Sequence, residues 1–208
     1  MTDKESERPI DACEQDDIKD GVAVGEEDAC VTKTDTPEEY KPEGRFERAL
    51  YAVSRDDGLA SILRILSYTA VMGALYAFIY RAVVLLGEKR YIDLAIFLSC
   101  LAVSFVAVTV ARRLINAKRP YELLAFYKEA PKKKKGCSFP SRHTFSIFAI
   151  GTALCYFDLV TGLILIAVGV IMAICRILLG YHFIRDTVAG ALIGALSGGL
   201  AVIFLAIF

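Results

Sequence analysis

The sequence predicts an all-α fold, a polytopic membrane helix bundle of about five transmembrane helices with an interfacial helix on its N-terminal side. The chain has 208 residues, of which 55% are hydrophobic, and a mean hydropathy of +0.47. Its charges are segregated, because residues 1–44 hold 15 Asp/Glu and 5 Lys/Arg whereas residues 45–208 hold 9 and 19. Apolar runs near the roughly 20 residues that a helix needs to cross a bilayer recur in the second segment.

Residues 1–44 are predicted to form a disordered acidic tail. Asp, Glu, Thr and Pro are frequent there and large apolar side chains are scarce, so the segment cannot bury enough surface to offset the entropy of ordering it. The simplest interpretation is a solvated spacer, and the alternative is a segment that docks a partner. Residues 45–208 then form the second unit, a membrane-embedded domain.

Residues 45–60 are predicted to form a helix that lies at the membrane interface. Phe46, Leu50 and Val53 fall on one helical face, and Arg48 and Arg55 lie on other sides of the helix. The segment is too short and too polar to span a bilayer, but it suits a helix lying in the interfacial plane.

Five segments are expected to span the membrane, approximately residues 62–86, 92–111, 143–158, 161–179 and 187–208. The third is short for a span. Counting crossings places the connections 112–142 and 176–186 on the same side of the membrane. The first connection contains Lys132–Lys135, which is either a solvated run or a segment that attracts anionic lipid.

Three clusters of ionisable residues lie on this shared side, and the first is Arg112-x6-Arg119-Pro120. Seven residues are close to two helical turns, so both guanidinium groups are expected on one face of a helix that Pro120 ends. Guanidinium groups bind phosphate oxygens through two parallel hydrogen bonds and remain charged. Basic residues at the end of a span are more often interfacial anchors, so this cluster alone is a weak signal.

The second cluster is Pro140-Ser141-Arg142-His143. Ser141 is expected near the N-cap of a helix, where backbone N–H groups and a hydroxyl favour an anion. His143 would lie within a turn of that anion and could give a proton to a leaving oxygen. A helix cap beside an interfacial histidine is the equally weighted alternative.

The third cluster is Cys175-Arg176-x5-His182-x3-Asp186. His182 and Asp186 share a helical face if the helix starts early enough, and if not they pair by side-chain reach. A carboxylate that accepts the Nδ1 hydrogen fixes the tautomer and leaves Nε2 free as nucleophile or base. A purely structural His–Asp pair is the alternative. Gly190, Gly194 and Gly198 follow at four-residue spacing and are expected to pack against another helix.

Together the three clusters resemble the signatures of the type 2 phosphatidic acid phosphatase superfamily, which are K-x6-R-P, P-S-G-H and S-R-x5-H-x3-D. Here they read R-x6-R-P at Arg112–Pro120, P-S-R-H at Pro140–His143 and C-R-x5-H-x3-D at Cys175–Asp186. The resemblance covers about residues 90–200 and leaves the acidic tail outside.

The resemblance implies a role for each motif residue. His182 would attack phosphorus to form a phosphohistidine, Asp186 would orient it, and His143 would protonate the leaving oxygen. The residues implied to bind the phosphate oxygens are Arg112, Arg119, Ser141, Arg142 and Arg176. These groups would supply the charge that another enzyme takes from a metal, so we expect neither a metal nor another cofactor.

This sequence departs from the family pattern at three positions. Arg112 replaces Lys and keeps the charge, and Cys175 replaces Ser and keeps a small side chain. Arg142 replaces Gly, so a bulky cation stands beside the phosphate position. Its backbone N–H can still donate, and we hypothesise that its side chain contacts a second phosphate or a headgroup.

The function expected from the resemblance is that of a membrane lipid phosphatase acting on phosphatidate, phosphatidylglycerophosphate or a polyprenyl diphosphate. A catalytically silent membrane adaptor of the same fold is the alternative, and a haloperoxidase is disfavoured because that chemistry belongs to soluble relatives. The expected partners are the lipid substrate and membrane lipids, without nucleic acid. We expect an integral protein of the plasma membrane and leave open its oligomeric state and which side its site faces.

Overall fold

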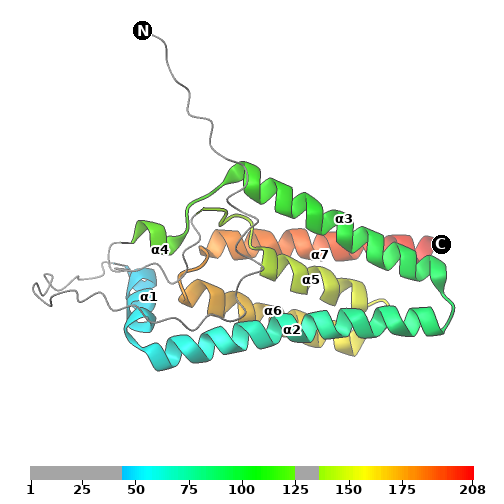
Figure 1. Cartoon of the computed structure of the whole chain (residues 1–208), viewed down its shortest axis with the longest axis horizontal. Helices are drawn as coiled ribbons and strands as arrows, with labels where there is room; N and C mark the ends of the chain where they lie inside the picture. The colour runs from blue at the N-terminus through cyan, green and yellow to red at the C-terminus, as the bar shows by residue number, and fades with distance from the viewer. Residues whose placement is uncertain (1–43, 125–135) are drawn as a thin grey trace, which may run out of the picture.

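The computed structural model describes residues 44–124 and 136–208. In these two stretches every regular element is a helix, which confirms the all-α class (Figure 1). The helices are α1 (Arg45–Arg55), α2 (Asp57–Gly87), α3 (Tyr91–Ile115), α4 (Pro120–Leu123), α5 (Arg142–Leu154), α6 (Leu159–Leu178) and α7 (Ile184–Ile207). The expected acidic tail, apart from Gly44, and the Lys132–Lys135 run lie outside the described residues.

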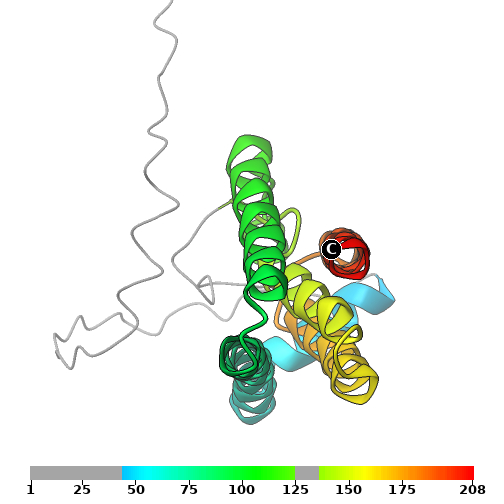
Figure 2. The ribbon, with the colours of Figure 1, turned by 90° about the vertical axis from the view of Figure 1, so that its right-hand side faces the viewer.

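The short helix α5 lies among the long helices α2, α3, α6 and α7, which run lengthwise along the bundle (Figures 1 and 2). α5 contacts all four of them, and its most extensive contact is with α7. Its buried side chains Phe145, Ile147 and Leu154 join the main hydrophobic core with Phe97 of α3 and Met172 of α6. The long helices also carry many exposed Leu, Ile and Val side chains, as expected of helices that face lipid.

Within residues 44–124 and 136–208, four stretches are long and apolar enough to cross a membrane, namely Asp57–Gly87, Tyr91–Leu123 (α3 together with α4), Leu159–Leu178 and Ile184–Ile207. The expected span over residues 143–158 needs correction, because α5 has 13 residues and would be only about 20 Å long. It ends at Leu154, where the chain turns towards α6. α5 still takes the chain to the far end of the bundle, where the Arg81 guanidinium carbon lies 4.0 Å from the Phe157 ring centre.

α7 packs against α5 along the row formed by Gly190, Gly194 and Gly198, which confirms the expected packing face. A Cβ at Gly190 would lie 2.6 Å from the Ser141 carbonyl oxygen, and one at Gly198 would lie 2.5 Å from another carbonyl oxygen of α5. The two helix backbones are therefore in direct contact, as in other small-residue interfaces between membrane helices. This contact joins the start of α7, which carries Asp186, to the start of α5.

α1 lies across one end of the bundle, roughly perpendicular to the long helices (Figure 1). Its buried residues, Leu50 and Val53, belong to the predicted apolar face, and Phe46 stacks on Phe183 with ring centroids 6.4 Å apart. The helix stops at Arg55, short of the predicted residue 60, because the following aspartate caps α2 by accepting one of its backbone N–H groups. The orientation suits a helix in the membrane interface.

Candidate active site

The loop that leads into α5 is attached to the end of α3 by hydrogen bonds. α3 ends because Asn116 adopts a left-handed conformation with φ 43°, which asparagine tolerates better than most residues. Asn116 Oδ1 accepts the Cys137 N–H at 3.2 Å, and the Ser138 N–H donates to the Ala117 carbonyl at 2.9 Å. These bonds determine where the loop carbonyls and the Ser138 side chain lie.

Arg112 and Arg119 do not share a helix, which corrects the expectation that they lie two turns apart on one face. Arg112 is in the last turn of α3, whereas Arg119 is the N-cap of α4, a helix that Pro120 begins. Both reach the same loop, because Arg112 Nη2 donates to the Cys137 carbonyl at 2.5 Å and Arg119 Nε donates to the Gly136 carbonyl at 2.9 Å. A carbonyl acceptor orients a guanidinium group without neutralising its charge.

α5 starts where the sequence predicted, with Ser141 as its N-cap. The Ser141 N–H donates to the Asp186 carbonyl at 2.9 Å, and its hydroxyl lies 3.0 Å from the Thr144 hydroxyl. The Ser141 side chain therefore does not cap the helix backbone, and the N–H groups of the first turn are oriented to favour an anion. His143 is the second residue of this turn and lies within electrostatic range of His182 and Arg176.

His182 lies in the turn before α7, because α7 begins only at Ile184. Its Nδ1 is 3.9 Å from Asp186 Oδ2, which is beyond hydrogen-bonding distance, so the two side chains do not bond directly. The Ser138 hydroxyl lies between them, donating to Asp186 Oδ2 at 2.5 Å and lying 3.4 Å from His182 Nδ1. The Phe183 N–H also donates to Asp186 Oδ2, at 3.1 Å.

Arg176 enters the site from the end of α6 and is buried beside aromatic rings. Its guanidinium carbon is 5.4 Å from the Tyr181 ring centre and 5.8 Å from that of Tyr68, within the range of cation–π attraction. Arg176 is 3% exposed, and its Nε finds no hydrogen-bond partner among the described residues. A buried N–H of this kind is stabilised by any acceptor that enters the site.

Positive charge exceeds negative charge in this buried cluster. In the described part of the chain, the buried side chains with a formal charge are three arginines and one aspartate: Arg112, Arg119, Arg176 and Asp186. Buried charge is unfavourable unless an opposite charge compensates it. The cluster is therefore suited to bind an anion.

The same surroundings keep His182 neutral. Burial lowers the pKa of His182 well below its usual value; Arg119, Arg112 and Arg176 lower it further, and the Ser138 main chain opposes the shift. A neutral imidazole has a lone pair, which a nucleophile or a general base needs.

Arg142 is half-buried in the first turn of α5. Its guanidinium carbon lies 5.7 Å from the Phe105 ring centre on α3, and it is within electrostatic range of His143. The structure thus brings all eight sequence-predicted site residues to one end of the bundle, with Arg142 at the side that faces α3.

Three residues of this site were missed in the sequence: Ser138, Asn116 and Glu122. Glu122 Oε1 accepts the Arg119 N–H at 3.2 Å and the Gly136 N–H at 2.7 Å, so it ties α4 to the loop. Asn116 carried a usable signal, since asparagine after an apolar helix favours a left-handed cap. Ser138 carried none, because its contact with Asp186 joins residues 48 positions apart.

The family model of the PAP2 superfamily matches residues 93–207. The chain belongs to the PAP2 superfamily. The matched stretch contains every motif residue described above, from Arg112 to Asp186. This PAP2 protein is also 42% identical over 60 residues to the bacitracin transport permease protein BcrC of Bacillus licheniformis. That alignment covers 29% of this chain and 30% of BcrC, so it spans less than a third of either protein.

Two solved structures share the fold of this PAP2 protein. Aquifex aeolicus LpxE superposes with a TM-score of 0.58 at 24% sequence identity, over 74% of this chain and 93% of LpxE. A transmembrane PAP2 type phosphatidylglycerolphosphate phosphatase from Bacillus subtilis superposes with a TM-score of 0.60 at 18% identity, over 76% of this chain and 85% of that one. The membership expected from the three motifs is confirmed, whereas the roles assigned to individual residues stay predictions.

Proposed function

We propose that this protein is a membrane lipid phosphatase that hydrolyses the phosphate monoester or diphosphate of a lipid through a phosphohistidine intermediate. The observation that carries the proposal is the cluster of three buried arginines around His182, at one end of a membrane bundle. The substrates that fit are phosphatidate, phosphatidylglycerophosphate and a polyprenyl diphosphate. The proposal places the protein in the plasma membrane, with residues 45–208 as the catalytic unit.

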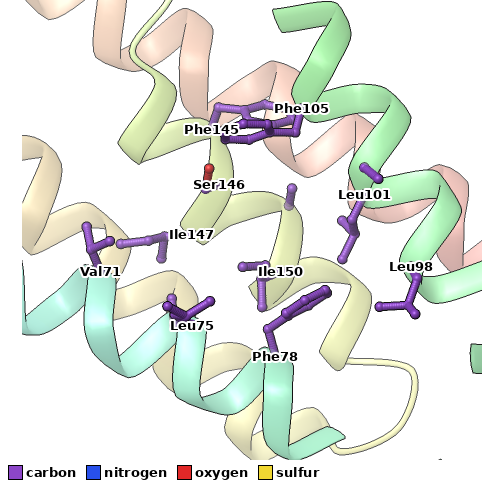
Figure 3. A pocket seen from close by; sticks show the side chains of 13 residues that line it. Val71, Leu75, Phe78, Leu98, Leu101, Phe105, Phe145, Ser146, Ile147 and Ile150 are labelled. Atoms are coloured by element: carbon purple, nitrogen blue, oxygen red, sulfur yellow. The ribbon is translucent and has the colours of Figure 1, made fainter. Parts of the chain in front are cut away.

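An apolar groove supports a lipid as the substrate. It has a volume of about 410 Å³ and is lined by α2, α3 and α5 (Figure 3). Its one polar lining residue is Ser146. The Ser146 hydroxyl donates to the Arg142 carbonyl at 3.0 Å, so it does not need a hydrogen-bond acceptor from a ligand. Phe105 and Phe145 line the end of the groove nearest to Arg142 and His143. A hydrocarbon chain in this groove would leave its phosphate near the arginine cluster.

In the first chemical step, Nε2 of neutral His182 forms a bond to phosphorus while the bond between phosphorus and the leaving oxygen breaks. The negative charge of the bound phosphate favours protonation of His143, which then gives its proton to that oxygen. The guanidinium groups of Arg112, Arg119 and Arg176, with Ser141 and the Arg142 N–H, stabilise the charge on the remaining phosphate oxygens.

In the second step, water attacks phosphorus and gives its proton to His143, which the first step left neutral. The phosphorus–nitrogen bond breaks and its electron pair returns to His182, so inorganic phosphate leaves and both histidines regain their starting forms. For a diphosphate substrate the leaving group of the first step is a lipid monophosphate. Arg142 would then contact that second phosphate.

The proposal is tested by phosphate release from the three lipid classes, using purified full-length protein with a chelator present. We expect at least one lipid to be hydrolysed and His182→Ala to be inactive. Lys118→Gln, which changes an exposed cation next to Arg119, should keep its activity and serves as the matched control. An acid-labile phosphoenzyme should form in the parent protein and not in His182→Ala.

Two results would contradict the proposal. One is the absence of hydrolysis with every lipid tested, which would favour the adaptor alternative. The other is His182→Ala activity equal to that of the parent. In residues 44–124 and 136–208, no group of three or more His, Cys, Asp or Glu side chains is placed to hold a metal ion. The chelator tests separately whether the enzyme needs a metal, because loss of activity on chelation would show that it does.

A further inference from the structure

The Ser138 side chain is fully buried and lies between the two residues expected to pair directly. It is 0% exposed, its hydroxyl oxygen is 2.5 Å from Asp186 Oδ2, and the same oxygen is 3.4 Å from His182 Nδ1. Because Nδ1 and Oδ2 are 3.9 Å apart, the hydroxyl is better placed than the carboxylate to bond with the ring.

The chemistry of the three groups determines the direction of each hydrogen bond. An ionised carboxylate only accepts, so the Ser138 hydroxyl hydrogen points to Asp186. A hydroxyl whose hydrogen is engaged can still accept through its oxygen lone pairs. The hydrogen bond between Ser138 and His182 therefore needs a hydrogen on Nδ1, and that tautomer leaves the lone pair of the neutral ring on Nε2.

We propose that Ser138 is a positioning residue that links His182 to Asp186 through the chain Nδ1–H···Oγ–H···Oδ2. This inference rests on the proposed function, because it explains how His182 presents Nε2 to phosphorus. The 3.4 Å contact is long for a hydrogen bond, and catalytic hydrogen bonds commonly shorten once the substrate is bound.

Two main-chain hydrogen bonds hold Ser138 and Asp186 in place. The Ser138 N–H donates to the Ala117 carbonyl after α3, and the Phe183 N–H donates to the Asp186 carboxylate at the start of α7. The groups with which His182 interacts electrostatically come from four further places in the fold. They are Arg112, Arg119, His143 and Arg176, and Asp186 lies beyond the Ser138 hydroxyl.

The kinetic test compares Ser138→Ala with Ser67→Ala, which removes another buried hydroxyl (Ser67 is 1% exposed and donates to the Leu63 carbonyl at 2.8 Å). By analogy with other residues that orient a catalytic ligand, we expect kcat to fall roughly 10- to 100-fold in Ser138→Ala, with KM nearly unchanged. Ser67→Ala should keep the parent kcat. Ser138→Thr, which retains the hydroxyl, should recover most of the loss if the extra methyl is accommodated.

The pH profile adds a readout that loss of packing alone would not change. The hydrogen bond from Nδ1–H to the Ser138 hydroxyl stabilises the imidazolium form of His182. Its loss in Ser138→Ala should therefore lower the pKa of His182 further. The acid limb of kcat/KM is then expected at lower pH in Ser138→Ala than in the parent. Ionisation of the substrate affects both proteins equally and cancels in the difference.

A double-mutant cycle tests whether Ser138 acts through Asp186. Because Asp186→Ala removes the acceptor of the Ser138 hydroxyl hydrogen, adding Ser138→Ala should lower kcat by less than about threefold in that background, far less than the single change does. Independent losses that multiply in the double variant would overturn the proposal.

A spectroscopic test keeps the inference separate from the proposed function. With isotope-labelled histidine and the His143→Gln change, His182 gives the single imidazole signal of a chain that has two histidines. We expect the Nδ1–H tautomer, and a partial shift to Nε2–H in Ser138→Ala, where the main-chain carbonyl of residue 138 remains near the ring. An Nε2–H tautomer in the parent would overturn the proposed role of Ser138. So would a Ser138→Ala variant in which neither the tautomer nor the acid limb of kcat/KM changes. Failure of the parent to hydrolyse any lipid would overturn the proposed function alone.

Discussion

The two ends of the bundle both carry arginines, but they hold them differently. At the end where α2 meets α3, Arg90 Nε lies 2.6 Å from Asp93 Oδ2, with side chains that are 42% and 16% exposed, and Arg81 stacks over Phe157. At the site end, Arg176 is 3% exposed, and the other buried arginines donate to main-chain carbonyls. Arg90 at the first end is exposed and pairs with a neighbouring carboxylate, and Arg81 is half-buried against an aromatic ring. The arginines at the second end are buried and converge.

This difference shows that arginine content alone does not mark a site in a membrane protein. An exposed arginine that pairs with a carboxylate contributes little to the free energy of unfolding, and it serves as an anchor at the membrane interface. Several buried guanidinium groups held by neutral main-chain acceptors retain their charge, which an incoming anion would help to compensate. The predictions that follow test this comparison.

The largest effect is expected when a buried arginine of the site is neutralised. Arg176→Gln should lower kcat/KM by about 100- to 1000-fold, the usual result of removing one preorganised donor to transition-state charge. The control is Arg64→Gln, an exposed arginine on α2, which should stay close to the parent in steady-state lipid hydrolysis. Equal losses in the two variants would mean that total charge matters and burial does not.

A somewhat smaller effect is expected from filling the site with an anion. Inorganic phosphate at about 100 times its dissociation constant should stabilise the folded protein by about 2.7 kcal/mol, seen as a rise in Tm. Arg119→Gln should reduce the rise, and Lys118→Gln, which changes the exposed neighbour, should keep it. A rise that persists in Arg119→Gln would place the bound anion elsewhere.

The site end was more predictable from sequence than its internal contacts. The lengths of the apolar runs indicate how often the chain runs from one end of the bundle to the other. That number places the three motifs at the same end. The positions of helix ends depend on single residues instead: Asn116 ends α3 early and separates Arg112 from Arg119. The length of α5 also depends on where the chain turns, so a 16-residue apolar window became a helix of 13 residues. The contact of Ser138 with His182 and Asp186 could not be predicted from the sequence, because it depends on how the loop folds and not on a local spacing of residues.

The site end also depends on the contact between α5 and α7, which a third prediction tests. A Cβ at Gly194 would collide with the Phe145 carbonyl and lie 2.9 Å from Phe148 Cβ, whereas a Cβ at Gly199 would meet nothing within 4 Å. Gly194→Ala should therefore destabilise the protein by about 1–3 kcal/mol through overpacking, and should lower activity by moving the start of α5. Gly199→Ala should be neutral or stabilising. Thermal unfolding in detergent measures both, and equal Tm values would show that the backbones are not in contact.

The smallest effect is expected at the opposite end, where the comparison began. Arg90→Gln removes a guanidinium that pairs with Asp93 and lies 5.9 Å from the Phe157 ring centre. Because the pair is partly exposed and water screens it, the loss should be about 0.2–1 kcal/mol of stability, with kcat/KM for lipid phosphate unchanged. A loss of activity comparable to that of Arg176→Gln would show that this end also contributes to the site. An unchanged rate together with a small fall in Tm would show that the same residue type anchors the bundle at one end and binds an anion at the other, according to its burial and partners.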